Sequence, residues 1–347
     1  MKKLISLLLA IMLCLALTAC GGGEKTVTLN ILNWEDYLEP ELIKKFESEN
    51  PDIKIKYKSM INNETMYAVL SRPDSVYDIC FPSDYMVERM KNEGLLYEYD
   101  YSTLSNYGNV PERFRGLPYD PDNRYSVPYT YGMLGILYNT EMVDDVVDSW
   151  DILWNLKYAN QIIMYDSIRD GMAVALKREG FSLNTTDQDE LDKAYEALIA
   201  QKKPLVKAYL TDDVKDTMIR GGAALAVVYS GDAVLCIQDN PNLRFAVPRE
   251  GTNLYFDAMV IMKNAKNPEA ALRFINFILD ADNAAVNCEY TGFTAANDAA
   301  IELMDPEITQ IEGFSFTEEE LQRGEVFRDL GELLRLYDDI WTRVKNA

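Results

Sequence analysis

The chain has 347 residues, of which 48% are hydrophobic, and its formal net charge is −22. This length and hydrophobic share are enough for one or two domains with buried cores. The acidic balance argues against nucleic acid as a partner, because nucleic-acid binding requires basic patches. The chain has no histidine, which excludes Ser-His-Asp and Cys-His catalysis and histidine-bound zinc.

The N-terminal residues have the pattern of an export and anchoring segment. Lys2 and Lys3 precede an apolar run, residues 4–17, that has signal-peptide length and is too short to span a membrane. Leu17-Thr18-Ala19-Cys20 reads as a lipobox, which predicts a signal peptide over residues 1–19 and a lipidated Cys20. Residues 20–26 then form a flexible, glycine-rich tether. Ordinary secretory cleavage before Cys20 is the less favoured alternative.

We therefore expect an extracytoplasmic lipoprotein that the lipid on Cys20 attaches to the membrane. It would lie on the outer face of a cytoplasmic membrane or in a periplasm. After removal of Cys14 with the signal peptide, Cys80, Cys236 and Cys288 remain besides Cys20. Three cysteines cannot all pair, so no disulfide framework is expected. Cys80 suits a buried position in a strand, and pairing of Cys236 with Cys288 stays open.

From Val27 onward, short apolar runs alternate with helical patterns. The expected strands are residues 28–32, 53–57 and 77–81, and the expected helices are 40–49, 64–70 and 85–92. This βαβ order predicts a mainly parallel sheet with right-handed crossovers. The loops after the first and third strands then meet at one edge of the sheet, where open α/β sheets bind their ligands.

The first of these loops, Asn33-Trp34-Glu35-Asp36-Tyr37, holds two aromatic rings and two carboxylates within four residues. Ring faces attract cations, and carboxylates accept their N–H groups, so this set suits an organic cation. Alternatively, Trp34 and Tyr37 anchor the core and the acids stabilise the N-terminus of the next helix. Spacing alone does not separate the two interpretations.

A second set of elements follows the turn-rich stretch 118–128. The expected strands are residues 161–164, 206–209, 224–228 and 243–247, and the expected helices are 150–156, 171–177, 190–200 and 213–220. Two apolar runs, 129–134 and 254–262, are expected to cross between the two sets. An amphipathic helix is expected over 268–279, and a helix-rich tail over 318–344 with a break near Gly331.

Several short motifs occur in the order in which one known family has them. They are Asn33-Trp34-Glu35-Asp36-Tyr37, Asn63-Glu64-Thr65-Met66-Tyr67, Tyr77-Asp78-Ile79 with Pro82-Ser83-Asp84-Tyr85-Met86, Tyr125-Ser126-Val127-Pro128-Tyr129, Tyr229-Ser230-Gly231-Asp232, and Val247-Pro248 with Glu250-Gly251. These motifs form an ordered set that runs from about Val27 to the C-terminus. Through this set, the chain resembles the spermidine/putrescine-binding proteins of polyamine ABC transporters.

Together with the element order, the resemblance predicts an α/β, two-lobed periplasmic-binding-protein fold, type II-like, with a hinge of crossing strands and an interlobe ligand cleft. The first lobe is expected over 27–132 plus 257–300, and the second over 133–256 plus 301–347. The implied function is capture of putrescine, spermidine or both and delivery to ABC permease subunits. We expect a monomer without catalytic residues, metal or cofactor.

The resemblance also implies a set of ligand-binding residues. They are Trp34, Glu35, Asp36, Tyr37, Ser83, Tyr85, Asp166, Asp170, Tyr229, Tyr255, Asp257 and Phe293. Within this set, Asp36, Asp170 and Asp257 are expected to pair with amines, while the aromatic rings enclose the methylene chain. Ser83 and Asp170 also suit helix N-termini, although the resemblance favours the ligand role for Asp170, and Tyr229 equally suits a core position.

Three positions depart from the family pattern. Ser167 stands where some relatives have an acid, Phe293 replaces a tyrosine, and Phe327 lies near a position that can be glutamine. The preferred ligand length therefore stays open, and Asp166 or Glu35 are candidates to compensate for the missing acid.

Rival functions remain at this stage. They are a secreted carboxylate-based glycosidase, a binder of ferric iron, a small anion or another organic cation, and a sensory or adhesive lipoprotein. No motif supports the hydrolase.

Overall fold

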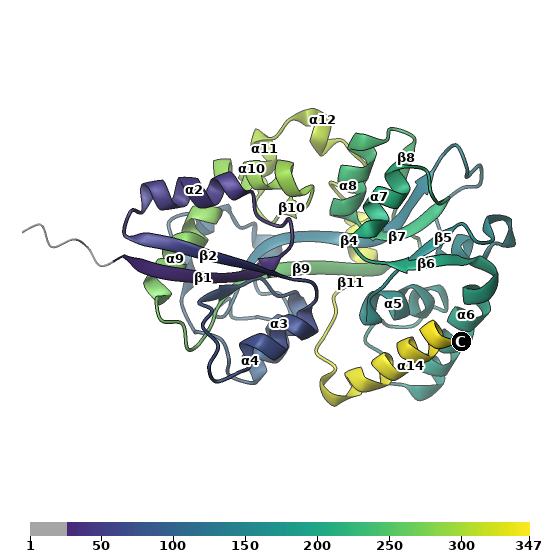
Figure 1. Cartoon of the computed structure of the whole chain (residues 1–347), viewed down its shortest axis with the longest axis horizontal. Helices are drawn as coiled ribbons and strands as arrows, with labels where there is room; N and C mark the ends of the chain where they lie inside the picture. The colour runs from purple at the N-terminus through teal and green to yellow at the C-terminus, as the bar shows by residue number, and fades with distance from the viewer. Residues whose placement is uncertain (1–25) are drawn as a thin grey trace, which may run out of the picture.

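The structure is a computed structural model that describes residues 26–347. The predicted signal peptide and the lipidation site at Cys20 lie outside these residues. Within residues 26–347, no helix combines the length and the apolar character needed to cross a membrane. The molecule is elongated, with a group of strands and helices at each end and long strands running between them (Figure 1).

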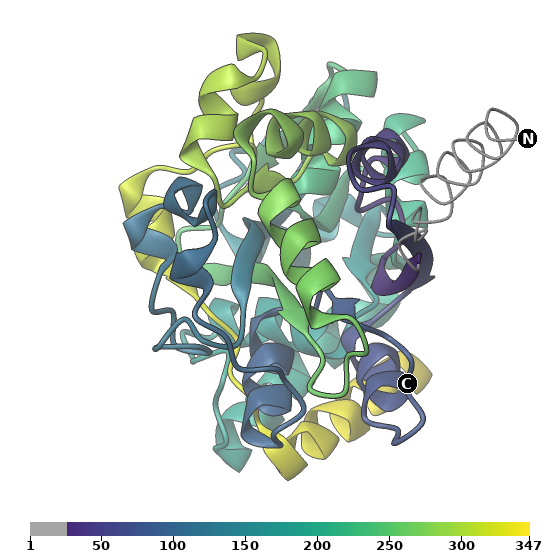
Figure 2. The same cartoon turned by 90° about the vertical axis from the view of Figure 1, so that its left-hand side faces the viewer.

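The first group alternates strands and helices, as the sequence pattern predicts. Its elements are β1 (Val27–Trp34), α2 (Pro40–Glu49), β2 (Ile53–Met60), α3 (Asn63–Leu70), β3 (Ile79–Cys80) and α4 (Asp84–Asn92). β1 lies between β2 and β3 and is parallel to both. Leu29, Ile31 and Leu32 on β1 are fully buried, because helices cover both faces of these strands (Figures 1 and 2).

Three short 3₁₀ helices follow α4 before the chain leaves this group. They are η1 (Tyr101–Thr103), η2 (Tyr107–Asn109) and η3 (Glu112–Phe114). The next element, β4 (Val127–Asn139), is buried along almost its whole length and pairs in antiparallel fashion with β9 (Thr252–Ile261). β9 also pairs with β3, whereas the second half of β4 pairs with strands of the other group. β4 and β9 are therefore the two expected crossing strands.

The second group of elements lies between the two crossing strands in the sequence. Its elements are η4 (Trp150–Trp154), η5 (Leu156–Tyr158), β5 (Ile162–Tyr165), α5 (Ile168–Arg178), α6 (Gln188–Leu205), β6 (Val206–Leu210), α7 (Asp213–Ile219), β7 (Leu225–Tyr229), α8 (Ser230–Asp239) and β8 (Leu243–Ala246). β5 is parallel to both β6 and β7. α6 runs beyond its expected end, because Gln201 and Leu205 continue its buried face.

The last part of the chain returns to both groups. Its elements are α9 (Pro268–Ile278), α10 (Ala281–Thr291), β10 (Thr294–Ala295), α11 (Asp298–Leu303), α12 (Pro306–Thr309), α13 (Glu318–Arg323), β11 (Gly324–Glu325), η6 (Gly331–Leu333) and α14 (Leu334–Asn346). The sequence pattern gave no element for residues 281–309. α10 has a weak hydrophobic pattern because its buried face consists of small or polar residues such as Ala284, Asn283 and Asn287.

The described residues form two main apolar cores. The first gathers β1, β2, β3, α2, α4 and α9, and the second gathers β4, β5, β7, α5, α6 and α14. We call the group of elements around the first core the first lobe and the group around the second core the second lobe. Phe327 belongs to the first core although α14, which follows it, packs into the second, so the residue boundaries expected for the lobes stay predictions. Cys80, Cys236 and Cys288 are buried free thiols.

Candidate ligand-binding site

Asp257 is the centre of a hydrogen-bonded group at the first lobe. It lies on β9 and is 7% exposed. The Tyr37 hydroxyl donates to its Oδ2 at 2.6 Å, and the Ser83 hydroxyl donates to its Oδ1 at 2.6 Å. Each carboxylate oxygen therefore has one hydroxyl donor, and the donors come from the two loops that the sequence places at one sheet edge.

Two side chains outside the expected ligand-binding set, Thr130 and Asn63, hold these hydroxyls in place. The Tyr37 hydroxyl also lies 2.6 Å from Thr130 Oγ1 on β4. Asn63 donates from Nδ2 to Ser83 Oγ at 3.0 Å and accepts the Ser83 backbone N–H at 3.1 Å. Ser83 makes no side-chain cap to α4, so its hydroxyl serves Asp257 rather than the helix end.

Burial governs the charge state of Asp257. It raises the pKa of this carboxyl to about 6, although the hydrogen bonds from Ser83 and Tyr37 favour the charged form. The neighbouring Asp170 raises the pKa further. Within residues 26–347, no lysine or arginine forms a salt bridge with either carboxylate.

Asp170 is the corresponding acid of the second lobe, 3% exposed at the start of α5. Its Oδ2 accepts from the Ser167 hydroxyl at 2.6 Å and from the Tyr229 hydroxyl at 2.7 Å. Its Oδ1 is buried and has no hydrogen-bond partner among the described residues. Burial raises the pKa of Asp170, and the two hydroxyls and the charge of Arg169 offset part of that rise.

The buried guanidinium of Arg169 serves other partners. It donates to the backbone oxygens of Arg328 and Leu183 and to the side-chain oxygen of Asn184. It also stacks on the Phe327 ring, 4.2 Å from the centroid. The Arg169 side chain therefore binds the loop between α5 and α6 and the C-terminal tail, and Asp170 keeps a bare oxygen.

A series of aromatic rings connects the two acids. Phe293 packs edge-on against Tyr37, with ring centroids 4.9 Å apart, and against Tyr255 at 6.3 Å. Tyr255 in turn packs against Tyr229 at 5.2 Å, and Tyr229 against Tyr165 at 4.9 Å. The rings thus run from the first-lobe acid to the second-lobe acid.

Two glycines allow the backbone to approach these rings. A Cβ atom at Gly231 would overlap the Phe293 ring, and one at Gly132 would overlap the Tyr255 and Ser230 hydroxyls. Any side chain at either position would displace an aromatic wall, so the wall and the glycines depend on each other.

Tyr85 forms the remaining edge of this group. Its hydroxyl donates to Glu64 Oε1 at 2.9 Å, and its ring lies edge-on to Phe327 with centroids 6.2 Å apart. Phe327 thereby brings the C-terminal tail against the site.

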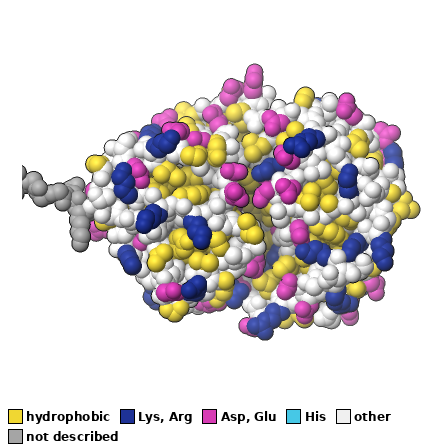
Figure 3. All heavy atoms as spheres, viewed as in Figure 1, with side chains coloured by type: hydrophobic (Ala, Val, Ile, Leu, Met, Phe, Trp, Pro, Cys, Tyr) yellow, Lys and Arg dark blue, Asp and Glu magenta, His cyan; other side chains and the backbone are white. Residues whose placement is uncertain are grey.

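The structure does not bring every expected residue into this group. Trp34 is half-buried at the end of β1, with a buried Nε1 that lacks a partner among the described residues, while Glu35 and Asp36 are exposed in the next loop. Acidic side chains gather near the middle of the face seen in Figure 3, where the two lobes adjoin. Asp166 lies apart, because its Oδ1 accepts from Trp341 and Lys345 on α14.

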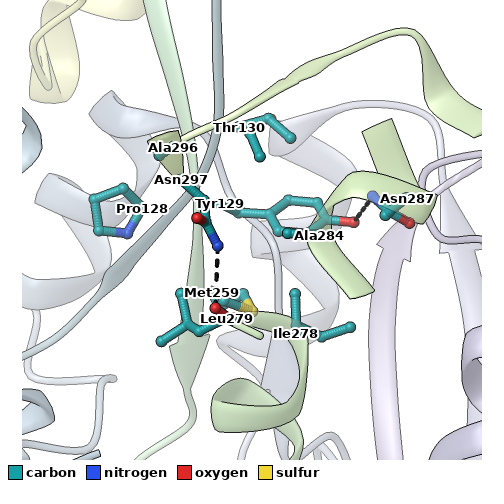
Figure 4. A pocket seen from close by; sticks show the side chains of 11 residues that line it. Pro128, Tyr129, Thr130, Met259, Ile278, Leu279, Ala284, Asn287, Ala296 and Asn297 are labelled. Atoms are coloured by element: carbon teal, nitrogen blue, oxygen red, sulfur yellow. Dashed lines mark hydrogen bonds between the residues drawn. The ribbon is translucent and has the colours of Figure 1, made fainter. Parts of the chain in front are cut away.

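A small pocket is lined by residues of β4, β9, α9, α10 and β10 (Figure 4). Its lining is mainly apolar and contains no carboxylate; Asn287 and Asn297 supply its side-chain amides. The Tyr129 hydroxyl accepts from Asn287 and donates to the backbone oxygen of Tyr37. The pocket walls therefore support Tyr37.

Chemically, two buried carboxylates that form no salt bridge with the described residues suit a ligand with positive charge at both ends. The rings between them suit an apolar spacer and attract cations by their faces. The residues that form this arrangement are Tyr37, Ser83, Tyr85, Asp170, Tyr229, Tyr255, Asp257 and Phe293, and we call it the interlobe site.

Comparison with known proteins adds evidence on the family and the fold. Residues 41–314 match the family model of bacterial extracellular solute-binding proteins. The chain is 34% identical to the spermidine/putrescine-binding periplasmic protein of Salmonella typhimurium, over 98% of this chain and 97% of that one.

Two solved structures extend the comparison. The spermidine/putrescine ABC transporter substrate-binding protein PotD of Streptococcus pneumoniae is 38% identical, with a TM-score of 0.82 over 92% of this chain and 98% of that one. The TpPotD lipoprotein of Treponema pallidum is 28% identical, with a TM-score of 0.83 over 92% and 99%. The resemblance noted in the sequence and the two-lobed α/β fold are thus confirmed.

Proposed function

The chain belongs to the family of bacterial extracellular solute-binding proteins, and on this premise we propose that it captures a polyamine between its lobes and delivers it to an ABC permease. The observation that carries this proposal is the pair of buried acids, Asp257 and Asp170, one on each side of a series of aromatic rings.

The charge of the site supports a ligand with at least two ammonium groups. A buried charge without a salt-bridge partner is unfavourable by several kcal/mol, so two such carboxylates favour either protonation or a cation. A polyamine supplies ammonium groups to both and fills the space between them with methylenes. Putrescine and spermidine, which the names of the relatives mention, both have this form.

Closure of the lobes is the proposed capture mechanism. Tyr37 and Ser83 come from the first lobe and Asp170 and Tyr229 from the second, while Asp257 lies on the crossing strand β9. A ligand that touches both groups stabilises the closed arrangement, and hinge motion about β4 and β9 would open it. Trp34, Glu35 and Asp36 belong to the proposal as residues of the site entrance.

The proposal includes location and partners. We infer a lipid on Cys20 that holds the mature chain at the outer membrane face or in the periplasm, next to its permease subunits. The relatives are named as periplasmic proteins or, in Treponema pallidum, as a lipoprotein. They are also named as binding proteins, which supports a binder without catalytic activity, and we propose that this binder is a monomer.

Calorimetric titration tests the proposal most directly. The soluble chain that begins after Cys20 is titrated separately with putrescine, spermidine and spermine; solved relatives match 92% of the chain, which supports folding of this form. We expect submicromolar affinity for at least one polyamine. Absence of heat and of any thermal shift with all three would overturn the polyamine assignment, and ferric iron and other organic cations would be tested next.

A further inference from the structure

Asn253 lies on the same face of β9 as the site residues Tyr255 and Asp257. Side chains two residues apart in a strand point to the same face, so these three line one side of β9 over about 13 Å. Asn253 is 2% exposed. Its position toward the second-lobe end of β9 is next to Asp170, and the amide N–H group of the Asn253 side chain helps to lower the pKa of Asp170.

Two acceptor atoms at this end have no donor within hydrogen-bond distance, although the Asn253 amide N–H lies close enough to Asp170 to lower its pKa. Asn253 Oδ1 and Asp170 Oδ1 are both buried, and neither has a hydrogen-bond partner among the described residues. A buried polar group without a hydrogen-bond partner is costly. Both of these neighbouring oxygens could accept a hydrogen bond from an N–H or O–H group of a ligand. By contrast, both oxygens of Asp257 already have hydroxyl donors.

We propose that Asn253 completes a primary-ammonium subsite with Asp170 and so determines which amines the second-lobe end of the site accepts. A primary ammonium carries three N–H donors, enough for both bare oxygens. The inference rests on the proposed function. The Asn253 side chain also supplies an acceptor at the end where Ser167 stands in place of an acid, without adding another buried charge.

The decisive experiment is a crystal structure of the soluble chain with putrescine, paired with titrations of Asn253→Leu. The leucine has a similar shape but removes the carbonyl acceptor. We expect an ammonium nitrogen about 3 Å from Asn253 Oδ1 and roughly tenfold weaker putrescine binding by the variant, as is typical for a lost hydrogen bond to a charged group.

Asn139→Leu is the matched control. Asn139 is 3% exposed at the far end of the other crossing strand, and its Oδ1 already accepts the Glu141 backbone N–H at 2.9 Å. This variant is expected to melt at a lower temperature than the parent while keeping its putrescine affinity. If Asn253→Leu fails to fold, Asn253→Ser replaces it in the titrations, and the crystal structure of the parent chain still tests the contact.

The outcomes separate this inference from the proposed function. A parent chain that binds no polyamine would overturn both. A parent that binds putrescine would overturn only the role of Asn253 if the complex has a water, and no ammonium nitrogen, on Oδ1, or if Asn253→Leu keeps the parent affinity.

Discussion

The two acids of the interlobe site differ in how their oxygens are satisfied before any ligand arrives. Asp257 has one hydroxyl donor on each oxygen, from Tyr37 and Ser83. Asp170 has both of its hydroxyl donors on Oδ2, from Ser167 and Tyr229, and none on Oδ1. The first-lobe acid is thus fully oriented in advance, whereas the second-lobe acid has an oxygen available for the ligand.

This difference suggests that the two acids have different roles when the lobes close on a ligand. Preorganised donors fix the position of Asp257, which lowers the entropic cost of binding at that end. At the second-lobe end, a free acceptor gives the ligand a contact that exists only once the ligand is enclosed. Such a contact favours the closed form over the open one.

The largest expected effect comes from removing the charge of the fully oriented acid. Asp257→Asn should weaken putrescine or spermidine binding at least a hundredfold, about 3 kcal/mol, because it leaves an ammonium enclosed without its counter-charge. Titration calorimetry of parent and variant measures the loss. The melting temperature of the unliganded variant at pH 7.5 should be no lower than that of the parent, because the variant buries no charge there. Unchanged titration curves would remove Asp257 from the site.

A matched pair of tyrosine variants tests the difference in hydrogen bonding. Tyr37→Phe and Tyr229→Phe each keep the ring and remove a hydroxyl donor from one carboxylate. Tyr37→Phe should weaken binding at least tenfold, because it leaves Asp257 Oδ2 bare and raises the pKa of this acid. Tyr229→Phe should weaken binding threefold or less, since Ser167 still donates to Asp170 Oδ2. Equal losses in the two titrations would contradict the comparison.

The raised pKa of Asp257 predicts opposite pH trends for binding and for stability. Its folded pKa of about 6 lies above the ordinary aspartate value near 3.9, so between these values the unliganded folded chain holds a proton that the unfolded chain lacks. The contribution of Asp257 to the free energy of unfolding therefore falls by about 3 kcal/mol as pH rises from 4 through 6. Cation binding needs the carboxylate, so polyamine affinity should fall about tenfold from pH 7 to pH 5.

Titrations and thermal melts across this pH range check both trends. Asp257→Asn is the control, because its stability profile should lack the component that falls as pH rises. A polyamine affinity of the parent chain that stays constant down to pH 5 would show that the Asp257 carboxyl titrates below this range.

Much of the fold followed from periodicity. Strands that bury Leu29, Ile31 and Leu32 and helices with large apolar faces have strong patterns, and the two crossing strands are long apolar runs. The helices over residues 281–309 gave no such signal, because alanines and asparagines form the buried face of α10. A pattern of large apolar residues cannot reveal a helix that packs through small ones.

The site was only partly predictable, because many of its contacts join elements that are far apart in the sequence. The meeting of Tyr37 with Ser83 follows from parallel strands whose loops share an edge. The supporting contacts of Thr130 and Asn63 depend on the distance between elements, which no local pattern contains. Asn253 had a usable signal, since alternation along β9 places it on the face of Asp257, but its bare oxygen is a property of the folded chain alone.

The smallest expected effect on binding comes from Asp166, whose side chain contacts α14 rather than the interlobe site. Asp166 and Asp170 lie four residues apart, but α5 begins between them, at Ile168. The helix turns Asp170 toward Tyr229, whereas Asp166 accepts from Trp341 Nε1 at 3.2 Å and Lys345 Nζ at 2.7 Å. Asp166→Asn should change polyamine affinity less than twofold and lower the free energy of unfolding by at most about 1 kcal/mol, since the ion pair is partly exposed.

Asp170→Asn is the companion variant, for which we expect a loss of affinity of at least tenfold in the same titration, because the second ammonium then loses its counter-charge. A tenfold loss in Asp166→Asn, with its melting temperature unchanged, would instead mean that Asp166 leaves α14 when the ligand binds. The second lobe would then contribute an acid that changes partner on closure, and the contrast between an oriented first-lobe acid and an available second-lobe acid would have to include Asp166 on the available side.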